Sequence, residues 1–188
     1  MGDRFCEPIF RWLRIRRMKP FINAETNLLD VGSGAEGTML KDLSPYIKRG
    51  VGIDVRAEAY DEGNIKIEQV EFDEKPLPFA HGSFDCASLL ATLEHMNRRV
   101  ELLQEIRRVL KPGGVLVITV PTWAAKPILE FLAFKLKIVS DVGVREHKTY
   151  FWKAELAEAL LAAGFSPEQT TVKYFELGFN LSAIAKNI

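Results

Sequence analysis

The sequence predicts an α/β fold, a three-layer sandwich in which helices cover both faces of a mostly parallel sheet. Apolar strand signals alternate with helical segments along its 188 residues, a pattern typical of parallel strands joined by crossover helices. A strand, a glycine-rich turn and a helix follow one another within Leu28–Leu43, where the sheet begins. Two strand signals near the end of the chain, Thr170–Phe175 and Asn180–Ala185, predict a closing antiparallel hairpin.

Composition limits the class of protein. The length predicts a single domain over residues 1–188 with a substantial core. Lys+Arg and Asp+Glu number 25 each, so no net charge favours a nucleic-acid partner. Cys6 and Cys86 lie far apart, which predicts reduced thiols and no metal site. We find no secretory signal and no run of roughly 18 uncharged apolar residues that predicts a transmembrane segment, so we expect a cytoplasmic protein.

Residues 1–25 predict an N-terminal helical segment. Apolar positions alternate with five basic residues between residues 11 and 19, and Pro20 ends the pattern. Two interpretations stay open. The helix packs over the site and leaves its basic face in solvent, or that face contacts an anionic substrate or a membrane surface.

The glycine-rich turn in Leu28–Gly37, read as LLDVGSGAEG, is suited to hold a nucleotide-like cofactor. The spacing Gly32-x-Gly34-x-x-Gly37 matches the dinucleotide fingerprint, and Asp54 follows about 20 residues later, as a ribose-binding acid does. These residues alone fit NAD. However, Asp30 lies two residues before the first glycine, and a carboxylate there suits a cofactor that carries positive charge rather than a pyrophosphate.

The rest of the chain continues the alternation of strand and helix signals. Gly50–Val55 predicts a buried strand that ends in Asp54, whose carboxylate either accepts both ribose hydroxyls or caps a helix over residues 56–62. The remaining strands and helices are predicted, in chain order, at Ile65–Phe72, Phe84–Ala91, Val100–Leu110, Val115–Val120 and Lys153–Ala163.

Taken together and in order, these motifs resemble class I S-adenosylmethionine (SAM)-dependent methyltransferases, in particular small-molecule enzymes of the type 11 kind. The resemblance runs from about residue 26 to the end of the chain. Four features carry it: Asp30–Gly34 (D-V-G-S-G), Asp54, Leu93–His95 (L-E-H) and Lys111–Gly114 (K-P-G-G). It implies a Rossmann-like, seven-stranded sheet and SAM as the cofactor. Glu36 departs from the family, because many members have a third glycine there.

The resemblance also implies which residues hold SAM. Asp54 would bind the ribose, and Val55 would pack against the adenine. Asp73, with Glu74 beside it, would accept a hydrogen bond from the adenine amino group. Main-chain carbonyls around Leu90 would receive the methionine ammonium group. The predicted cofactor-binding residues are Asp30, Gly32, Ser33, Gly34, Asp54, Val55, Asp73, Glu74 and Leu90.

Three residues are candidates for catalysis. An imidazole can accept a proton at neutral pH, so His95 is a candidate base if the acceptor must lose a proton. A structural role at the strand end is its alternative. His147 and Tyr150 precede the last helix, in a segment that often borders the acceptor in the family, although packing or capping explains them as well. No metal ligand is predicted.

Residues 123–140 depart from the minimal fold, because WAAKPILEFLAFKLKIV predicts an inserted helix with one broad apolar face. That helix could cap the pocket of a partly hydrophobic acceptor, form an oligomer contact or rest on a lipid surface. All three interpretations stay open.

The sequence therefore predicts methyl transfer from SAM to an oxygen, nitrogen or carbon nucleophile on a small, partly hydrophobic acceptor. An NAD(P)-dependent oxidoreductase is an alternative that uses the same glycine turn, although little chain remains for the second domain it needs. A catalytically inactive, methyltransferase-like binding or assembly protein is the other alternative.

Overall fold

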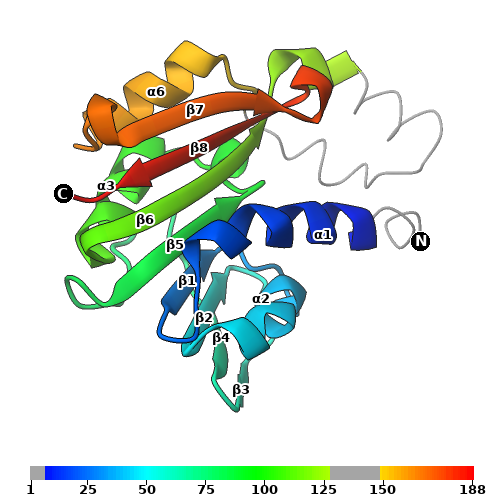
Figure 1. Cartoon of the computed structure of the whole chain (residues 1–188), viewed down its shortest axis with the longest axis vertical. Coiled ribbons are helices and arrows are strands. Elements are labelled where there is room, and N and C mark those ends of the chain that lie inside the picture. Colours follow the sequence, from blue (N-terminus) through cyan, green and yellow to red (C-terminus); the bar gives the residue numbers. More distant parts are fainter. Residues whose placement is uncertain (1–6, 128–148) are drawn as a thin grey trace.

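A computed structural model describes residues 7–127 and 149–188, with side chains from residue 12 onward (Figure 1). The described residues form one eight-stranded sheet with the strand order β3-β4-β2-β1-β5-β6-β8-β7. The strands are β1 (Asn27–Val31), β2 (Arg49–Asp54), β3 (Tyr60–Glu62), β4 (Ile65–Gln69), β5 (Phe84–Leu90), β6 (Leu110–Pro121), β7 (Thr170–Phe175) and β8 (Asn180–Lys186). Strands β4, β2, β1, β5 and β6 are parallel, whereas β3, β7 and β8 pair antiparallel.

Helices cover both faces of the sheet, which confirms the predicted α/β sandwich (Figure 1). The helices are α1 (Glu7–Met18), α2 (Thr38–Leu43), α3 (Arg99–Val109) and α6 (Lys153–Ala162). One apolar cluster joins α1 and α2 to one face, and the other joins α3 and α6 to the opposite face. None of the helices in the described part of the chain is long and apolar enough to span a membrane.

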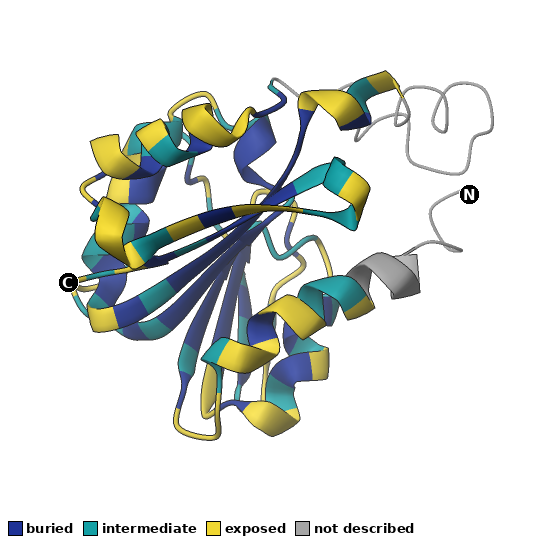
Figure 2. Cartoon of the chain, turned by 45° about the horizontal axis from the view of Figure 1, so that its top comes forward, coloured by how far each residue is buried: buried dark blue, intermediate teal, exposed yellow. Residues whose placement is uncertain are grey.

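The direction of the side chains alternates along the central strands, and this alternation explains why there are two apolar clusters. Leu28 of β1 packs with α1 and α2, whereas Leu29 and Val31 pack with α3 and α6, because successive side chains of a strand point to opposite faces. Both faces of these strands are covered, so they read as nearly continuous apolar runs. Figure 2 shows the result, with buried central strands and helices exposed only on their outer sides.

The sheet has one strand more than the seven expected, and residues 56–62 do not form the helix considered as the alternative context for Asp54. Instead, β3 pairs with β4 across a two-residue connection that begins at Gly63, which has a φ of 63°. The next residue, Asn64, donates from Nδ2 to the carbonyls of Ser44 and Ile47, at 2.9 Å each. These bonds hold the connection in place and stabilise the added edge strand.

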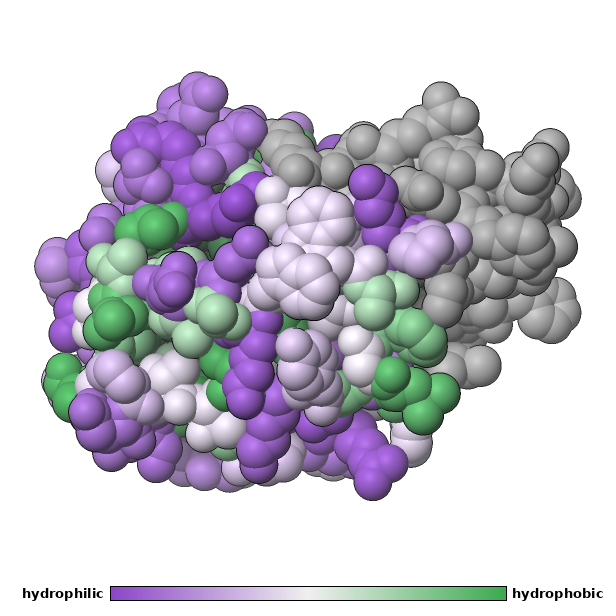
Figure 3. Space-filling view, turned by 90° about the horizontal axis from the view of Figure 1, so that it is seen from above, coloured by the Kyte–Doolittle hydropathy of each residue, from purple (hydrophilic) through white to green (hydrophobic). Residues whose placement is uncertain are grey.

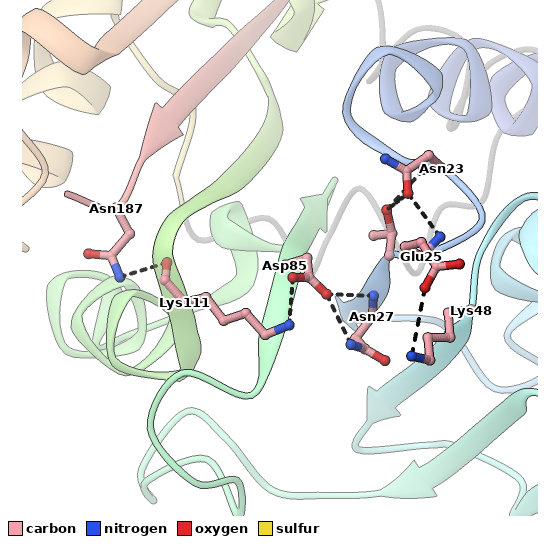
Figure 4. Close-up of polar contacts among 8 residues, drawn as sticks. Asn23, Glu25, Asn27, Lys48, Asp85, Lys111 and Asn187 are labelled. Carbon is pink, nitrogen blue, oxygen red and sulfur yellow. Dashed lines mark hydrogen bonds and ion pairs between the residues drawn. The ribbon is translucent and has the colours of Figure 1, made fainter.

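The amino ends of the strands are joined by polar contacts (Figure 4). Asp85 of β5 accepts hydrogen bonds from the backbone N–H and Nδ2 of Asn27, at 2.9 and 3.0 Å, and from Lys111 Nζ at 2.6 Å. Partial burial acts to raise the pKa of Asp85, but the bonds from Lys111 and Asn27 outweigh it and lower the pKa. Asn187 Nδ2 also donates to the carbonyl of Lys111. These contacts fix the edge of the sheet opposite the candidate site.

Candidate functional site

The candidate site lies at the carboxyl edge of the parallel strands, where the glycine-rich turn follows β1. The N–H groups of Gly32 and Ser33 both donate to the carbonyl of Ile53, at 2.8 and 3.1 Å, which fastens the turn to the end of β2. Gly32 has a φ of 81°, and a Cβ at this position would lie 2.2 Å from Oγ1 of Thr92. A side chain therefore does not fit here, and the turn packs directly on the segment after β5.

The other two glycines of the turn are also left-handed. Gly34 has a φ of 75°, and an added Cβ would meet nothing within 4 Å, so its backbone faces open space where a ligand can approach. Gly37 has a φ of 58°, and a Cβ there would lie 2.1 Å from Ile67 Cδ1. The helix α2 that follows has six residues. The glycine spacing predicts a sharp, ligand-accessible turn, and the backbone has this form.

Asp54 ends β2 and faces the turn. Its Oδ2 accepts from the N–H of Gly34 at 3.0 Å, and its Oδ1 accepts from the N–H of Arg56 at 2.9 Å. Each carboxylate oxygen can accept more than one hydrogen bond, so both can still receive hydroxyl donors. The next residue, Val55, has 40% of its surface exposed and offers an apolar contact beside this carboxylate.

Asp30 lies beneath the turn and is only 3% exposed. Ser88 Oγ on the neighbouring β5 donates to its Oδ1 at 2.7 Å. Burial raises the pKa of Asp30 to about 6, although the bond from Ser88 and the charge of Arg14 on α1 act to lower it. A ligand with a positive charge would stabilise the ionised form of this carboxyl.

A second buried carboxyl, Glu94, follows β5 in the turn Leu93–His95 and is only 1% exposed. Burial raises its pKa to about 8, with the charge of Arg14 again acting to lower it. The L-E-H motif is recognisable in the sequence, but sequence reasoning missed Glu94 as a site residue. The signal for it is the motif itself, which places a carboxylate three residues after the apolar strand signal Phe84–Ala91.

The segment between β5 and Glu94 has an unusual backbone. Ala91 has a φ of 55°, which is uncommon for a residue with a side chain, and its N–H donates to the carbonyl of Thr119 at 2.9 Å. Thr92 Oγ1 donates to the carbonyl of Leu90 at 3.3 Å. The N–H of half-buried His95 donates to the carbonyl of Thr92 at 3.0 Å. Leu90 ends β5 at this edge, and the binding of the methionine ammonium group by its carbonyl remains a prediction.

The acids predicted to contact adenine lie in the loop after β4. Asp73 accepts from the N–H of Asn97 at 2.9 and 3.2 Å, from Asn97 Nδ2 at 2.7 Å and from the N–H of Arg98 at 3.1 Å. It therefore ties the loop to the start of α3. Glu74 is exposed to solvent. The adenine contact remains a prediction for both residues.

Aromatic residues lie beyond the end of β6. The rings of Trp123 and Tyr150 are 5.7 Å apart, and Lys126 Nζ lies 5.5 and 5.9 Å from their centroids. The chain around Tyr150 joins the rest of the site, because the N–H of Thr149 donates to the carbonyl of Glu94 at 3.2 Å. This arrangement brings Tyr150 close to the L-E-H turn.

Two sequence predictions lie largely or wholly outside the described residues. His147 falls in residues 128–148, which the structure does not describe. The same holds for most of the helix predicted over 123–140, whose described part is the short helix Trp123–Ala125 and the residues up to 127.

The charges at this edge favour a cofactor that carries positive groups. Asp30 lies beneath the turn, where its carboxylate would repel a pyrophosphate, whereas Asp54 suits the ribose of either cofactor. Glu94, whose pKa burial raises to about 8, adds a third buried carboxyl at the end of β5. The open backbone of Gly34 and the acceptors on Asp54 leave room for a hydroxyl-bearing group. The residues present therefore fit SAM. Within the described residues, no group of three or more His, Cys, Asp or Glu side chains could hold a metal ion.

Comparison with known proteins agrees with this geometry. Residues 29–118 match the family described as methyltransferase domain. An uncharacterised 37.1 kDa protein in transposon TN4556 of Streptomyces fradiae is 35% identical over 151 residues, which cover 73% of this chain and 43% of that protein. A ubiquinone/menaquinone biosynthesis C-methyltransferase, UbiE, of Geobacter sp. (strain M21) is 30% identical over 146 residues, which cover 71% of this chain and 62% of that protein. The chain thus spans about half the length of these two relatives.

Solved structures share the fold. A SAM-dependent methyltransferase from Archaeoglobus fulgidus superposes with a TM-score of 0.71 at 17% identity, covering 96% of this chain and 93% of that one. One from Aquifex aeolicus has a TM-score of 0.68 at 20% identity, covering 100% and 95% of the two chains.

Proposed function

We propose, from the premise that this chain belongs to the class I SAM-dependent methyltransferases, that it transfers the methyl group of SAM to a small, partly hydrophobic acceptor. The observation that carries the proposal is the set of buried or nearly buried carboxyls, Asp30, Asp54 and Glu94, around an open glycine turn. A nicotinamide dinucleotide would bring its pyrophosphate to the turn above the carboxylate of Asp30, so the oxidoreductase alternative is not favoured.

In this proposal each group of residues at the carboxyl edge of the parallel strands holds one part of SAM. Asp54 accepts the ribose hydroxyls, Val55 packs against the adenine, and the Asp73–Glu74 pair borders the adenine amino group. Gly32, Ser33 and Gly34 line the methionine portion. Asp30 and the carbonyl of Leu90 stabilise the positively charged end.

SAM supplies a methyl group activated by a positive sulfur. The chain's own residues position the acceptor in line with it and exclude water. In this proposal Trp123 and Tyr150, whose rings lie 5.7 Å apart, line the acceptor side. His95, half-buried beside Glu94, accepts a proton if the acceptor must lose one; His147 stays a second candidate for that step.

The named activity of the UbiE relatives suggests a first acceptor class to test, a ring carbon on a molecule with a hydrophobic tail. Aromatic residues at the end of β6 suit such a ring. The inserted segment 123–140 remains a proposed cap, oligomer contact or lipid contact, and a cytoplasmic location remains part of the proposal.

Isothermal titration calorimetry tests the cofactor directly. We expect binding of SAM and S-adenosylhomocysteine and none of NAD. Asp54→Asn should weaken SAM binding by about 1–3 kcal/mol, because it removes a charged acceptor. The matched control Asp61→Asn changes an exposed acid on the edge strand β3 and should leave SAM affinity unchanged. Equal affinity in Asp54→Asn and wild type would contradict the ribose assignment.

A turnover assay distinguishes an active methyltransferase from the catalytically inactive binding or assembly protein. Hydrophobic phenols, quinols and amines would be incubated with SAM, and release of S-adenosylhomocysteine would be measured. Release with at least one acceptor is expected. Tight SAM binding without release from any acceptor, together with a stable complex with another protein, would favour the binding or assembly protein.

A further inference from the structure

The hairpin between β7 and β8 ends in an unusual tip. Glu176 and Leu177 are left-handed, with φ values of 52° and 58°, and Gly178 follows with a φ of 90°. Two consecutive non-glycine residues in this region are rare, because the Cβ approaches the following carbonyl. The backbone turns Leu177 outward, so that 95% of its surface is exposed. Strain of this kind often marks a functional position.

Hydrogen bonds hold the tip in this form. Thr122 Oγ1 donates to the carbonyls of Gly178 and Phe179, at 2.8 and 3.1 Å. The N–H of Thr122 donates to the carbonyl of Phe179 at 2.9 Å. Asn180 Nδ2 also donates to the side chain of Glu176. The exposed leucine is therefore carried on a fastened loop.

Helix α1 lies next to this tip. The guanidinium of Arg17 on α1 lies 4.5 Å from the ring centroid of Phe175, two residues before Leu177. On the same helix, the guanidinium of Arg16 lies 5.4 Å from the ring of Trp12, which is itself exposed. Figure 1 shows α1 and the β7–β8 end on the same side of the molecule. We call Trp12, Arg16, Arg17, Phe175 and Leu177 the tip–helix surface.

The tip–helix surface has the composition of a membrane-contact site. It combines a projecting aliphatic side chain, two aromatic rings and two cations, and one acid, Glu176, which accepts from Asn180 Nδ2, lies directly beside Leu177. Seen from above, pale and green residues gather right of the centre of the molecule, next to purple ones (Figure 3). Aromatic side chains favour the lipid headgroup region, and arginines keep their charge there while their stems pack on apolar surface.

We propose that the tip–helix surface docks on an anionic lipid bilayer and inserts Leu177 among the acyl chains. A protein partner is a poorer match, because a stable interface buries about 800 Å² on each partner, whereas the apolar part of this surface is one leucine and two aromatic rings beside two cations. Anionic headgroups complement Arg16 and Arg17, and attraction to such a surface gives about fivefold in affinity for each basic residue.

The tip–helix surface lies near the acceptor side of the candidate site. Thr122, which holds the tip, directly follows β6 and precedes Trp123 on the acceptor side. Docking would therefore bring the carboxyl edge of the sheet close to the bilayer, from which a hydrophobic acceptor can enter. This last step rests on the proposed function, whereas docking itself does not.

Vesicle co-sedimentation of the full chain tests the proposal. We expect binding to vesicles of phosphatidylglycerol and phosphatidylcholine, little binding to phosphatidylcholine alone, and release at high salt. Leu177→Asn should weaken binding by about tenfold, and it should fold normally because Asn tolerates the left-handed conformation. The matched control Leu161→Asn changes an exposed leucine on α6 and should bind as wild type does.

Further outcomes separate the alternatives. Arg16→Gln with Arg17→Gln should reduce binding about 25-fold if both act independently, and Lys153→Gln on α6 should not change it. Absence of binding to anionic vesicles, or equal binding by Leu177→Asn and wild type, would refute docking. A dimer in light scattering that Leu177→Asn disrupts, without vesicle binding, would assign the surface to self-association instead. SAM affinity measured on the same samples reports on the proposed function separately.

Discussion

Replacing Asp30 with asparagine should change stability and cofactor affinity in opposite directions. The asparagine side chain would keep an oxygen that accepts from Ser88 Oγ, which now lies 2.7 Å from the carboxylate, but it would never carry a charge. The variant thus removes the ionisation of a side chain that is 3% exposed while it preserves its shape.

The magnitude follows from the pKa of Asp30, which burial raises from 3.8 to about 6. This difference corresponds to roughly 3 kcal/mol, since one pKa unit is about 1.36 kcal/mol. The folded state binds the proton more tightly than the unfolded state, so this contribution is fully present below pH 3.8 and is lost as the pH rises through about 6. Burial also raises the pKa of Glu94, to about 8, so its contribution to the free energy of unfolding is likewise lost as the pH rises, but at higher pH.

Urea unfolding between pH 5 and 8.5, with and without SAM, measures both effects. We expect the cofactor-free wild type to lose stability from pH 5 to 7, and Asp30→Asn to lose less over this interval. SAM should bind wild type more tightly as Asp30 ionises, whereas the variant should bind SAM more weakly, by about 1–3 kcal/mol at pH 7.5. The control Asp85→Asn should instead lose stability at neutral pH, because the pKa of Asp85 is lowered in the fold. Identical pH profiles of wild type and Asp30→Asn would refute the reasoning.

Two other substitutions test the turn and the acceptor side. Gly32→Ala should destabilise the fold by about 1–3 kcal/mol in thermal unfolding, because its Cβ would lie 2.2 Å from Thr92 Oγ1 and φ is 81°; a normal melting temperature would contradict this. Trp123→Ala should lower kcat/KM for a hydrophobic acceptor by about tenfold through loss of the aromatic contact with Tyr150, with SAM affinity unchanged. Parallel loss of SAM affinity would place Trp123 in the cofactor pocket.

The sequence predicts those elements best whose form depends on local signals. The strand predicted at Thr170–Phe175 has the bounds of β7, because a run of β-branched and aromatic residues between turns needs no distant partner to be recognised. The spacing of the glycines at 32, 34 and 37 predicts a sharp turn, and all three are left-handed. Asp54 is predicted at the end of its strand, and it faces that turn.

Features that depend on distant contacts cannot be predicted in this way. The short strand β3 forms because β4 offers an edge for it, and three residues carry no periodicity of their own. Likewise, β6 begins at Leu110 rather than Val115, because Leu110 pairs with Phe84 across an irregular register. The burial of Glu94 depends on packing around the end of β5, which a single carboxylate in the sequence does not reveal.

The polar contacts around Asp85 have a consequence for how a ligand reaches its pocket. They tie β1, β5 and the start of β6 together at one end, while toward the other end β1 and β5 share the bond from Ser88 Oγ to Asp30 and the turn is held by single backbone bonds. Thermal fluctuations can therefore loosen the ligand-facing end without separating the strands. Amide exchange should become faster along each strand from Asp85 toward the glycines, and a bound ligand should slow it only at the fast end.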